Sequence, residues 1–224
     1  MISLVKEIPK LNLPLAEAVK INCTYNLYRD IAIFWVQDNE RAVISMLDGN
    51  MVIYNNCANI EELRKFIEVI SPNSVFSDAK TMEMLFEQDF KRACVVKSEH
   101  QFKSIIASDI LNSEEIYNLL NVRELQLPPY EYFAVDFCHR LNHGQLKYFA
   151  VKQKCIAIGI FDGQAVLVNG IASHQKGMGT VAIWGLLARY NCAAIAVCEK
   201  EVMPFYLKNN FSYTYDVGYW RKSS

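Results

Sequence analysis

Residues 171–180, IASHQKGMGT, combine residue types that could bind a phosphate group. Lys176 supplies a positive charge, and Gly177 and Gly179 stand where an apolar run passes into a helix-like segment. Glycines let the backbone approach a ligand closely, and the N-terminus of a helix attracts anions. The same residues also suit a simple turn before a helix. The pattern alone therefore leaves two interpretations open.

The chain repeats itself, which gives this stretch a comparison. An offset of 114 residues relates several pairs: Leu13-Pro14 and Leu127-Pro128, Glu17 and Glu131, Asp48-Gly49 and Asp162-Gly163, Asn55 and Asn169. Each copy predicts a helix that opens at proline, a strand, and a hairpin with an Asp-Gly turn.

The copies differ in the interval that holds the glycines. After the hairpins the offset grows to 121 residues, as between Phe90 and Phe211, so the second copy gains seven residues there. In the first copy this interval has no glycine, and Asn59 is followed by Glu61 and Glu62. Two carboxylates at a helix start would repel a phosphate. Any anion site is therefore expected in the second copy alone.

The second copy predicts helices at 113–120 and 129–143, strands at 146–152, 155–161 and 164–172, a helix at 177–190, a strand at 193–198, a helix at 201–209 and a strand at 211–220. With His174-Gln175-Lys176-Gly177-Met178-Gly179 after the third strand, this order resembles the GNAT superfamily of N-acetyltransferases. The family signature is a strand, then Gln/Arg-x-x-Gly-x-Gly/Ala, then a helix. His174 departs from the first position of that signature, and the loop is shorter than is usual in the family.

The resemblance implies an α+β fold (α/β in some schemes) with two GNAT-like domains in tandem, each a mixed, mostly antiparallel sheet flanked by helices. Residues 1–100 would form a degenerate N-terminal domain, and residues 101–224 the domain that binds acetyl-CoA, without a metal. In the family, the loop binds the pyrophosphate of coenzyme A, and the strand before it binds the pantetheine arm. The residues so implied are Asn169, Ile171, Ala172, Ser173, His174, Gln175, Lys176, Gly177, Met178, Gly179 and Thr180.

A second family feature lies in CEKEVMPFYLKNNFSYTY. Tyr206 matches a tyrosine that, in many members, protonates the departing thiolate, and Phe211 matches the phenylalanine that follows. A phenol of pKa near 10 is a suitable acid for a thiolate whose conjugate thiol has a pKa of about 8.5. Asn210 stands where glycine is commoner, and Asn tolerates the left-handed conformation. Glu199 has three interpretations: a general base, a helix cap or a solvated side chain. The first copy has Leu85 in place of the tyrosine.

The predicted helix 129–143 carries polar residues on one face. Asp136, His139 and Arg140 have helical spacing, and the corresponding helices line the acceptor site in GNAT proteins, so these three residues are predicted to contact the substrate. A metal site on this face and a Cys138–His139 nucleophile pair are alternatives. Both fit poorly, because a metal needs ligands that converge in a fixed geometry and neighbours along one helix cannot form a catalytic Cys-His pair without help.

The composition restricts the partners. A net charge of -1 and a pI near 6.4 give no general attraction to nucleic acids or anionic membranes. No apolar run is long enough to cross a membrane. Seven cysteines without a CxxC pair are typical of a reducing compartment, so a cytoplasmic location is expected. A homodimer is one assembly that the sequence leaves open.

These observations favour an N-acetyltransferase that moves an acetyl group from acetyl-CoA to a primary amine of a small molecule or peptide. Two other functions stay open. One is a GNAT-like module that binds acyl-CoA without catalysis, and the other is a transferase that uses a different acyl donor.

Overall fold

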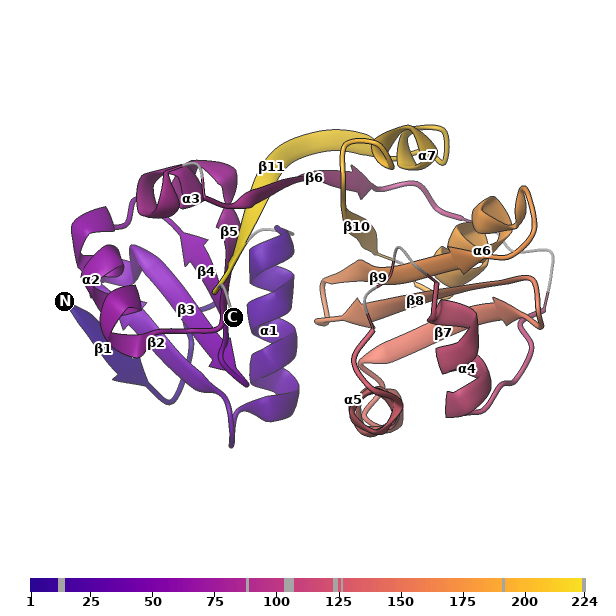
Figure 1. Ribbon diagram of the computed structural model, residues 1–224, viewed down its shortest axis with the longest axis horizontal. Coiled ribbons are helices and arrows are strands. Elements are labelled where there is room, and N and C mark those ends of the chain that lie inside the picture. The colour runs from indigo at the N-terminus through magenta and orange to yellow at the C-terminus, as the bar shows by residue number, and fades with distance from the viewer. Residues whose placement is uncertain are drawn as a thin grey trace. The chain divides into compact units, whose positions relative to one another are not determined.

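From the helix Ala16–Tyr28 in the first half and the helix Tyr130–Asn142 in the second, the order is the same: helix, three strands, helix, strand, helix, strand, with a short 3-10 helix (Asp38–Glu40) added in the first half. A computed structural model describes residues 1–11, 15–87, 89–102, 107–122, 125, 127–190 and 192–222 (Figure 1). Leu13-Pro14, where the first-copy helix was predicted to open, lie outside these residues. The contacts divide the chain into two units. The first unit holds 1–96, 197–204 and the C-terminal segment from Tyr213, and the second holds 97–196 and 205–212.

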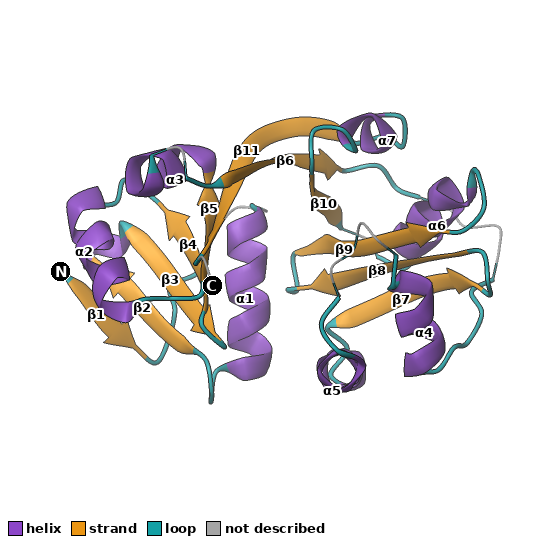
Figure 2. Cartoon of the chain, viewed as in Figure 1, coloured by secondary structure: helices purple, strands orange, loops and turns teal. Residues whose placement is uncertain are grey.

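The first unit contains most strands of a mixed sheet, together with helices (Figure 2). Its strands lie in the order β1 (Ile2–Val5), β2 (Ile33–Gln37), β3 (Ala42–Leu47), β4 (Asn50–Asn55), β5 (Ser74–Asp78), β11 (Ser212–Arg221) and β6 (Lys91–Ser98). Its helices are α1 (Ala16–Tyr28), α2 (Ile60–Ile70) and α3 (Ala79–Phe86). The predicted boundary at residue 100 divides the chain into two continuous domains. In the structure, β11 pairs antiparallel with β5, so most of the last strand of the chain belongs to the first unit.

Alternation along the strands of the first unit builds two apolar layers. Val43 packs with residues of α1, while its neighbour Ile44 packs with residues of α2 and α3. Successive side chains of a strand point to opposite faces, so α1 covers one face and α2 with α3 the other. The hairpin between β3 and β4 has Asp48 and Gly49 at φ of 50° and 75°, as an Asp-Gly turn requires.

The second unit repeats this plan. Its strands lie in the order β10 (Ala193–Cys198), β9 (Ala165–Ser173), β8 (Cys155–Phe161) and β7 (Leu146–Val151). Its helices are α4 (Ser113–Leu120), α5 (Tyr130–Asn142), α6 (Met178–Leu187) and, from Phe205 on, α7 (Met203–Leu207). The predicted fold class is confirmed, although the helices predicted at 177–190 and 201–209 are shorter than expected.

Helix α6 packs tightly on one face of the strands of the second unit. Phe149 and Ala157 form a core with Leu186 of α6. A Cβ at Gly185 would lie 2.4 Å from the Phe149 ring, so only glycine allows this approach. Ile158, the neighbour of Ala157, faces the other side, where α4 and α5 lie. The two faces of these strands are thus covered by different helices.

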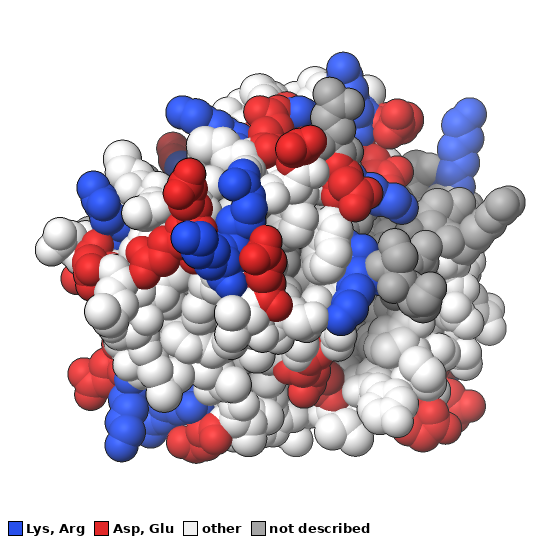
Figure 3. Space-filling view, turned by 60° about the vertical axis from the view of Figure 1, so that its left-hand side comes forward, with Lys and Arg blue, Asp and Glu red and all other residues white. Residues whose placement is uncertain are grey.

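The surface carries mixed charges (Figure 3), and the cysteines form no disulfides. Figure 3 shows Lys and Arg side chains interspersed with Asp and Glu side chains on the face that it presents. In the part of the chain that is described, no helix is both long and apolar enough to cross a membrane. All seven cysteines are free thiols.

Candidate functional site

Strand β9 opens away from its neighbour at Asn169. Pairing between β9 and β10 is parallel and runs from Ala165 to Val168, but β9 continues to Ser173. On the β8 side, Val168 pairs with Gly159 and Gly170 pairs with Ile158, so Asn169 is an extra residue in a bulge. Beyond the bulge, among the described residues, β9 has a backbone edge that β10 does not pair.

A short turn leads from β9 into α6. Ser173 Oγ donates a hydrogen bond to the carbonyl of Gln175 (2.7 Å), and the amide of Met178 donates to the same carbonyl (3.1 Å). Gly177 has φ of 86°, a left-handed conformation that costs other residues energy. Gly177 also has no side chain with which to cap α6. The turn therefore presents the start of α6 without a side-chain cap.

His174 is held at the side of this turn. Its ring nitrogen Nε2 lies 2.9 Å from the carbonyl oxygen of Leu119, near the end of α4. Because a carbonyl only accepts, Nε2 carries the proton in this bond. The backbone amide of His174 donates to the carbonyl of Lys154 (2.8 Å). The side chain in the Gln/Arg position of the signature thus fastens the turn to the rest of the second unit.

A hollow of about 370 Å³ lies in front of the turn. Its lining residues are Ser173, His174, Gln175, Lys176, Gly177, Gly179, Thr180, Phe205 and Lys208. The lining contains two lysines and no carboxylate, and within the described residues neither lysine is in an ion pair. Such a hollow is complementary to an anion such as a pyrophosphate.

Phe205 and Lys208 were missed from the sequence. A Cβ at Gly179 would lie 3.2 Å from the Phe205 ring, so the second glycine makes room for this side chain. The two residues are three apart, spanning the C-terminal part of α7 and the residue after it, which is the spacing of one helix face. This helical spacing, on either side of the candidate catalytic residue Tyr206, was the sequence signal that could have identified them.

Tyr206 lies on α7 and is 7% exposed. Its ring packs edge to face with Phe205 and with Phe211, each at a centroid distance of 5.3 Å. Asn210 has φ of 65°, so the predicted left-handed conformation at the family's glycine position is confirmed. The lining of the hollow includes Phe205 and not Tyr206.

Cys198 and Glu199, at the end of β10, are two groups that could take part in proton transfer or nucleophilic attack. Glu199 is exposed in the turn before α7, and its carbonyl accepts from the amides of Val202 and Met203. Burial, followed by the nearby Cys94, raises the pKa of the Cys198 thiol to about 11. Cys198 is therefore a neutral thiol at physiological pH and a poor nucleophile.

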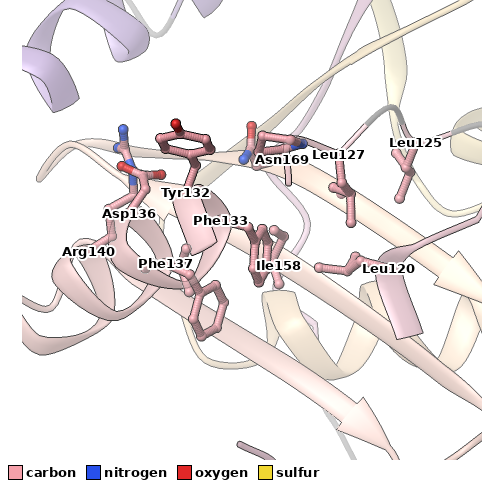
Figure 4. Close-up of a pocket in the computed structure, with 13 residues that line it drawn as sticks. Leu120, Leu125, Leu127, Tyr132, Phe133, Asp136, Phe137, Arg140, Ile158 and Asn169 are labelled. Atoms are coloured by element: carbon pink, nitrogen blue, oxygen red, sulfur yellow. The ribbon is translucent and has the colours of Figure 1, made fainter. Parts of the chain in front are cut away.

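A second hollow, of about 300 Å³, lies between α5 and the bulge of β9 (Figure 4). Asp136, Arg140 and Asn169 line it, so two of the three predicted substrate residues meet the bulge there. His139 is absent from this lining; its ring lies 4.4 Å from that of His143. The sequence did not reveal the apolar lining, which comes from α4, the loop after it, α5, β7 and β8: Leu120, Leu125, Leu127, Pro128, Phe133, Phe137, Leu146 and Ile158.

A third hollow, of about 390 Å³, also reaches His174 and is lined by Leu111, Glu115, Asn118, Leu119, Lys152, Gln153 and His174. Lys152 Nζ lies 2.8 Å from Glu115 Oε1, and this hydrogen bond lowers the pKa of Glu115 and raises that of Lys152. Among the described residues, no group of three or more His, Cys, Asp or Glu side chains could hold a metal ion.

The parallel strands that part at a bulge, followed by a glycine turn and a helix, define the class of the second unit. The chain has the fold of the GNAT N-acetyltransferases, in a layout like that of a tandem protein. No protein-family model and no curated protein matches the sequence.

Solved structures with this fold match nearly the whole chain. A tandem GNAT protein from the clavulanic acid biosynthesis pathway is 11% identical, with 96% of this chain and 91% of that chain covered at a TM-score of 0.56. A GNAT-family acetyltransferase from Colwellia psychrerythraea is 12% identical, covering 99% and 100% at 0.53. A GCN5-related N-acetyltransferase from Sphaerobacter thermophilus is 11% identical, covering 85% and 80% at 0.52. At these identities the likeness shows the fold alone.

Proposed function

We propose that the chain is an acyltransferase whose second unit binds acetyl-CoA and transfers the acetyl group to a primary amine. The observation that carries this proposal is the hollow that joins Lys176 and Lys208 to the start of α6. It lies next to the open edge of β9, and the fold supports acyl transfer as the general reaction. The fit is to a ligand with a polyanionic end and an extended arm, as coenzyme A has.

In this proposal the pyrophosphate accepts hydrogen bonds from the two lysines and from the amides of the first turn of α6. The pantetheine arm lies along residues 169–173 of β9 and pairs with its backbone like an added strand. Both parts of the ligand then use elements of the second unit. His174 positions the turn through its bond to Leu119 instead of binding the anion.

The reaction is a direct attack. The amine nitrogen forms a bond to the thioester carbonyl carbon, the carbon–sulfur bond breaks, and the sulfur leaves as a thiolate. We assign Tyr206 as the acid that protonates this thiolate and Glu199 as the carboxylate that receives the proton from the amine, directly or through water. No metal takes part. Holding the two reactants in line supplies much of the acceleration in such a reaction.

The test combines binding and turnover. Calorimetry should show acetyl-CoA binding at micromolar to high micromolar concentrations, and an amine panel should increase thiol release from acetyl-CoA. Tyr206→Phe should lower the turnover rate about 10²-fold or more while leaving acetyl-CoA affinity nearly unchanged. Tyr54→Phe, in the first unit, is the control. Absence of acetyl-CoA binding would overturn the proposal.

A second candidate is a binding module without transfer chemistry. The packing of Tyr206 between Phe205 and Phe211 favours it, because a buried tyrosine also serves simply as core. Coenzyme A binding with no thiol release from any amine would select the module. Competition by longer acyl-CoAs would show whether another donor is preferred.

The location and partners follow from the same chemistry. We propose that the protein works in the cytoplasm, since seven free cysteines suit a reducing compartment. A small molecule or a peptide supplies the amine. Light scattering, which measures the molar mass in solution, tests whether the chain forms a homodimer.

A further inference from the structure

The hollow between α5 and β9 has an apolar floor. Phe133 and Phe137 are both buried and stack with a centroid distance of 5.3 Å, and Tyr117 packs edge to face on Phe133 at 5.2 Å. Ile158 and Leu120 complete this side in Figure 4. A floor of packed rings and aliphatic groups favours the apolar body of a ligand over a charged one.

The rim of the same hollow carries one charge of each sign. Arg140 Nε lies 3.0 Å and 2.9 Å from the two carboxylate oxygens of Asp136, one turn away on α5. The Arg140 side chain is 15% exposed and that of Asp136 is 53% exposed. In Figure 4, these two side chains lie on the same side as Tyr132 and Asn169, away from the apolar floor.

The size of the hollow limits its occupant. About 300 Å³ is at the lower end of the range for small-molecule pockets. The volume therefore suits a small molecule with one apolar group on the floor and a pair of charges at the rim.

We propose that this hollow binds an α-amino acid with an apolar side chain, and that this amino acid is the acceptor of the acetyl group. The inference rests on the proposed function for its reaction and on the hollow for its specificity. The α-carboxylate pairs with the guanidinium of Arg140, which has five N–H donors, the ammonium lies near Asp136, and the side chain packs on Phe133 and Phe137.

This placement brings the amine to the bulge at Asn169, where β9 parts from β10. The amine loses a proton and attacks the thioester carbonyl. The products are the N-acetyl amino acid and free coenzyme A, and one proton is released per turnover. An amine without a carboxylate would leave Arg140 without a partner in the ligand. A diamine would place a second cation over the apolar floor.

Ligand binding tests this inference without any turnover. L-phenylalanine and L-leucine should bind the wild-type chain in calorimetry or ligand-observed NMR at low millimolar concentrations. Phenylalaninamide and phenethylamine, which lack the carboxylate, should bind at least about tenfold more weakly, as expected when a charged hydrogen bond is lost. L-lysine should bind more weakly as well.

Variants assign the two charges. Arg140→Gln should weaken the binding of phenylalanine about tenfold or more, and phenylalanine and phenylalaninamide should then bind with equal affinity. Asp136→Asn should weaken the binding of phenylalanine and that of phenethylamine by the same factor. Glu131→Gln, an exposed carboxylate on the same helix, is the matched control and should leave all affinities unchanged. Thermal unfolding of each variant shows whether it is folded.

The outcomes separate this inference from the proposed function. If acetyl-CoA binds and neither amino acid does, or if the carboxylate-free analogues bind as tightly as phenylalanine, the inference is wrong and the proposed function stands. If phenylalanine binds and depends on Arg140 but acetyl-CoA does not bind, the acceptor role and the proposed function both fail. A peptide whose N-terminal phenylalanine binds as tightly as free phenylalanine would also overturn the inference.

Discussion

The connection between β4 and α2 in the first unit and that between β9 and α6 in the second solve the same geometric problem differently. In the first, side chains take up the backbone amides: Asn55 Oδ1 accepts from Ala58, Gln37 Oε1 from Asn59, and Asn59 Oδ1 from Glu62. In the second, Gly177 cannot cap α6, and two lysines line the hollow in front of it. One helix start is satisfied internally and is acidic, while the other has the features an anion needs.

The strands before these connections differ in the same direction. In the first unit, Ser77 Oγ donates to the carbonyl of Ile53 (2.9 Å), and Asn55 Nδ2 donates to Thr81 Oγ1 (2.6 Å), just where pairing of β4 with β5 ends. At the repeat offset of 121 residues, the second copy has Cys198 and Val202 in place of Ser77 and Thr81. Neither supplies the same hydrogen bond. The first unit thus closes with its own side chains the place where the proposal puts a ligand in the second.

The largest expected effect comes from removing both lysines of the hollow. The double variant Lys176→Ala with Lys208→Ala should bind acetyl-CoA about 100-fold more weakly, because each charged hydrogen bond contributes about 1.5 kcal/mol or more to the binding free energy. Calorimetry at two salt concentrations measures the loss, and the residual binding should depend less on salt.

The matched control for this pair lies in the first unit. Lys65 on α2 and Lys80 on α3 are both exposed, and replacing both with alanine should leave acetyl-CoA affinity unchanged. Equal losses in the two double variants would mean that only the overall charge matters, and the contrast between the units would be lost.

Gly177→Ala should cost about 1–2 kcal/mol of stability, because alanine is strained at a φ of 86°. A Cβ there meets nothing within 4 Å, so the cost is conformational and not steric. Denaturant unfolding measures it. Gly144→Ala is the control in the same unit, with φ of 70° and equally open surroundings. Both variants should lose stability, and only Gly177→Ala should also lose acetyl-CoA affinity.

Asn59→Ala tests whether the first connection is structural alone. Losing this cap should cost about 1 kcal/mol of unfolding free energy. Asn59→Asp should retain most of the stability, since Asp caps helices as well as Asn. Neither change should affect acetyl-CoA binding. A weaker affinity in Asn59→Ala would place ligand contacts in the first unit and contradict the comparison.

Local patterns in the sequence predicted much of this fold. The Asp48-Gly49 hairpin and the left-handed Asn210 are confirmed, because a tight turn and a helix end depend on a few neighbouring residues. The second Asp-Gly hairpin is also present, but only Gly163 has positive φ there, and Asp162 instead accepts two amides in a longer loop.

The missed features depend on contacts between distant segments. The pairing of β11 with β5 and the bond from His174 to Leu119 leave no local pattern in the sequence. The three candidate substrate residues share one helix face, yet only the neighbouring strand decides that Asp136 and Arg140 line the hollow while His139 packs with His143. Side chains on one helix can be grouped from the sequence, but what they face cannot.

The smallest expected effect is a difference in pH dependence between Glu17 and Glu131, which occupy equivalent positions in the two copies. Glu17 is buried and accepts a hydrogen bond from Tyr215 (2.6 Å), whereas Glu131 is exposed. Burial raises the pKa of Glu17, and the Tyr215 bond offsets part of this. The folded state therefore holds this proton more tightly than the unfolded chain, and stability should fall as pH rises from 4.5 through the raised pKa. Glu17→Gln keeps an acceptor for Tyr215 but cannot ionise, so its thermal stability relative to wild type should increase between pH 4.5 and 7.5, whereas that of Glu131→Gln should not. If the two variants respond alike, the buried carboxylate does not distinguish the first unit from the second.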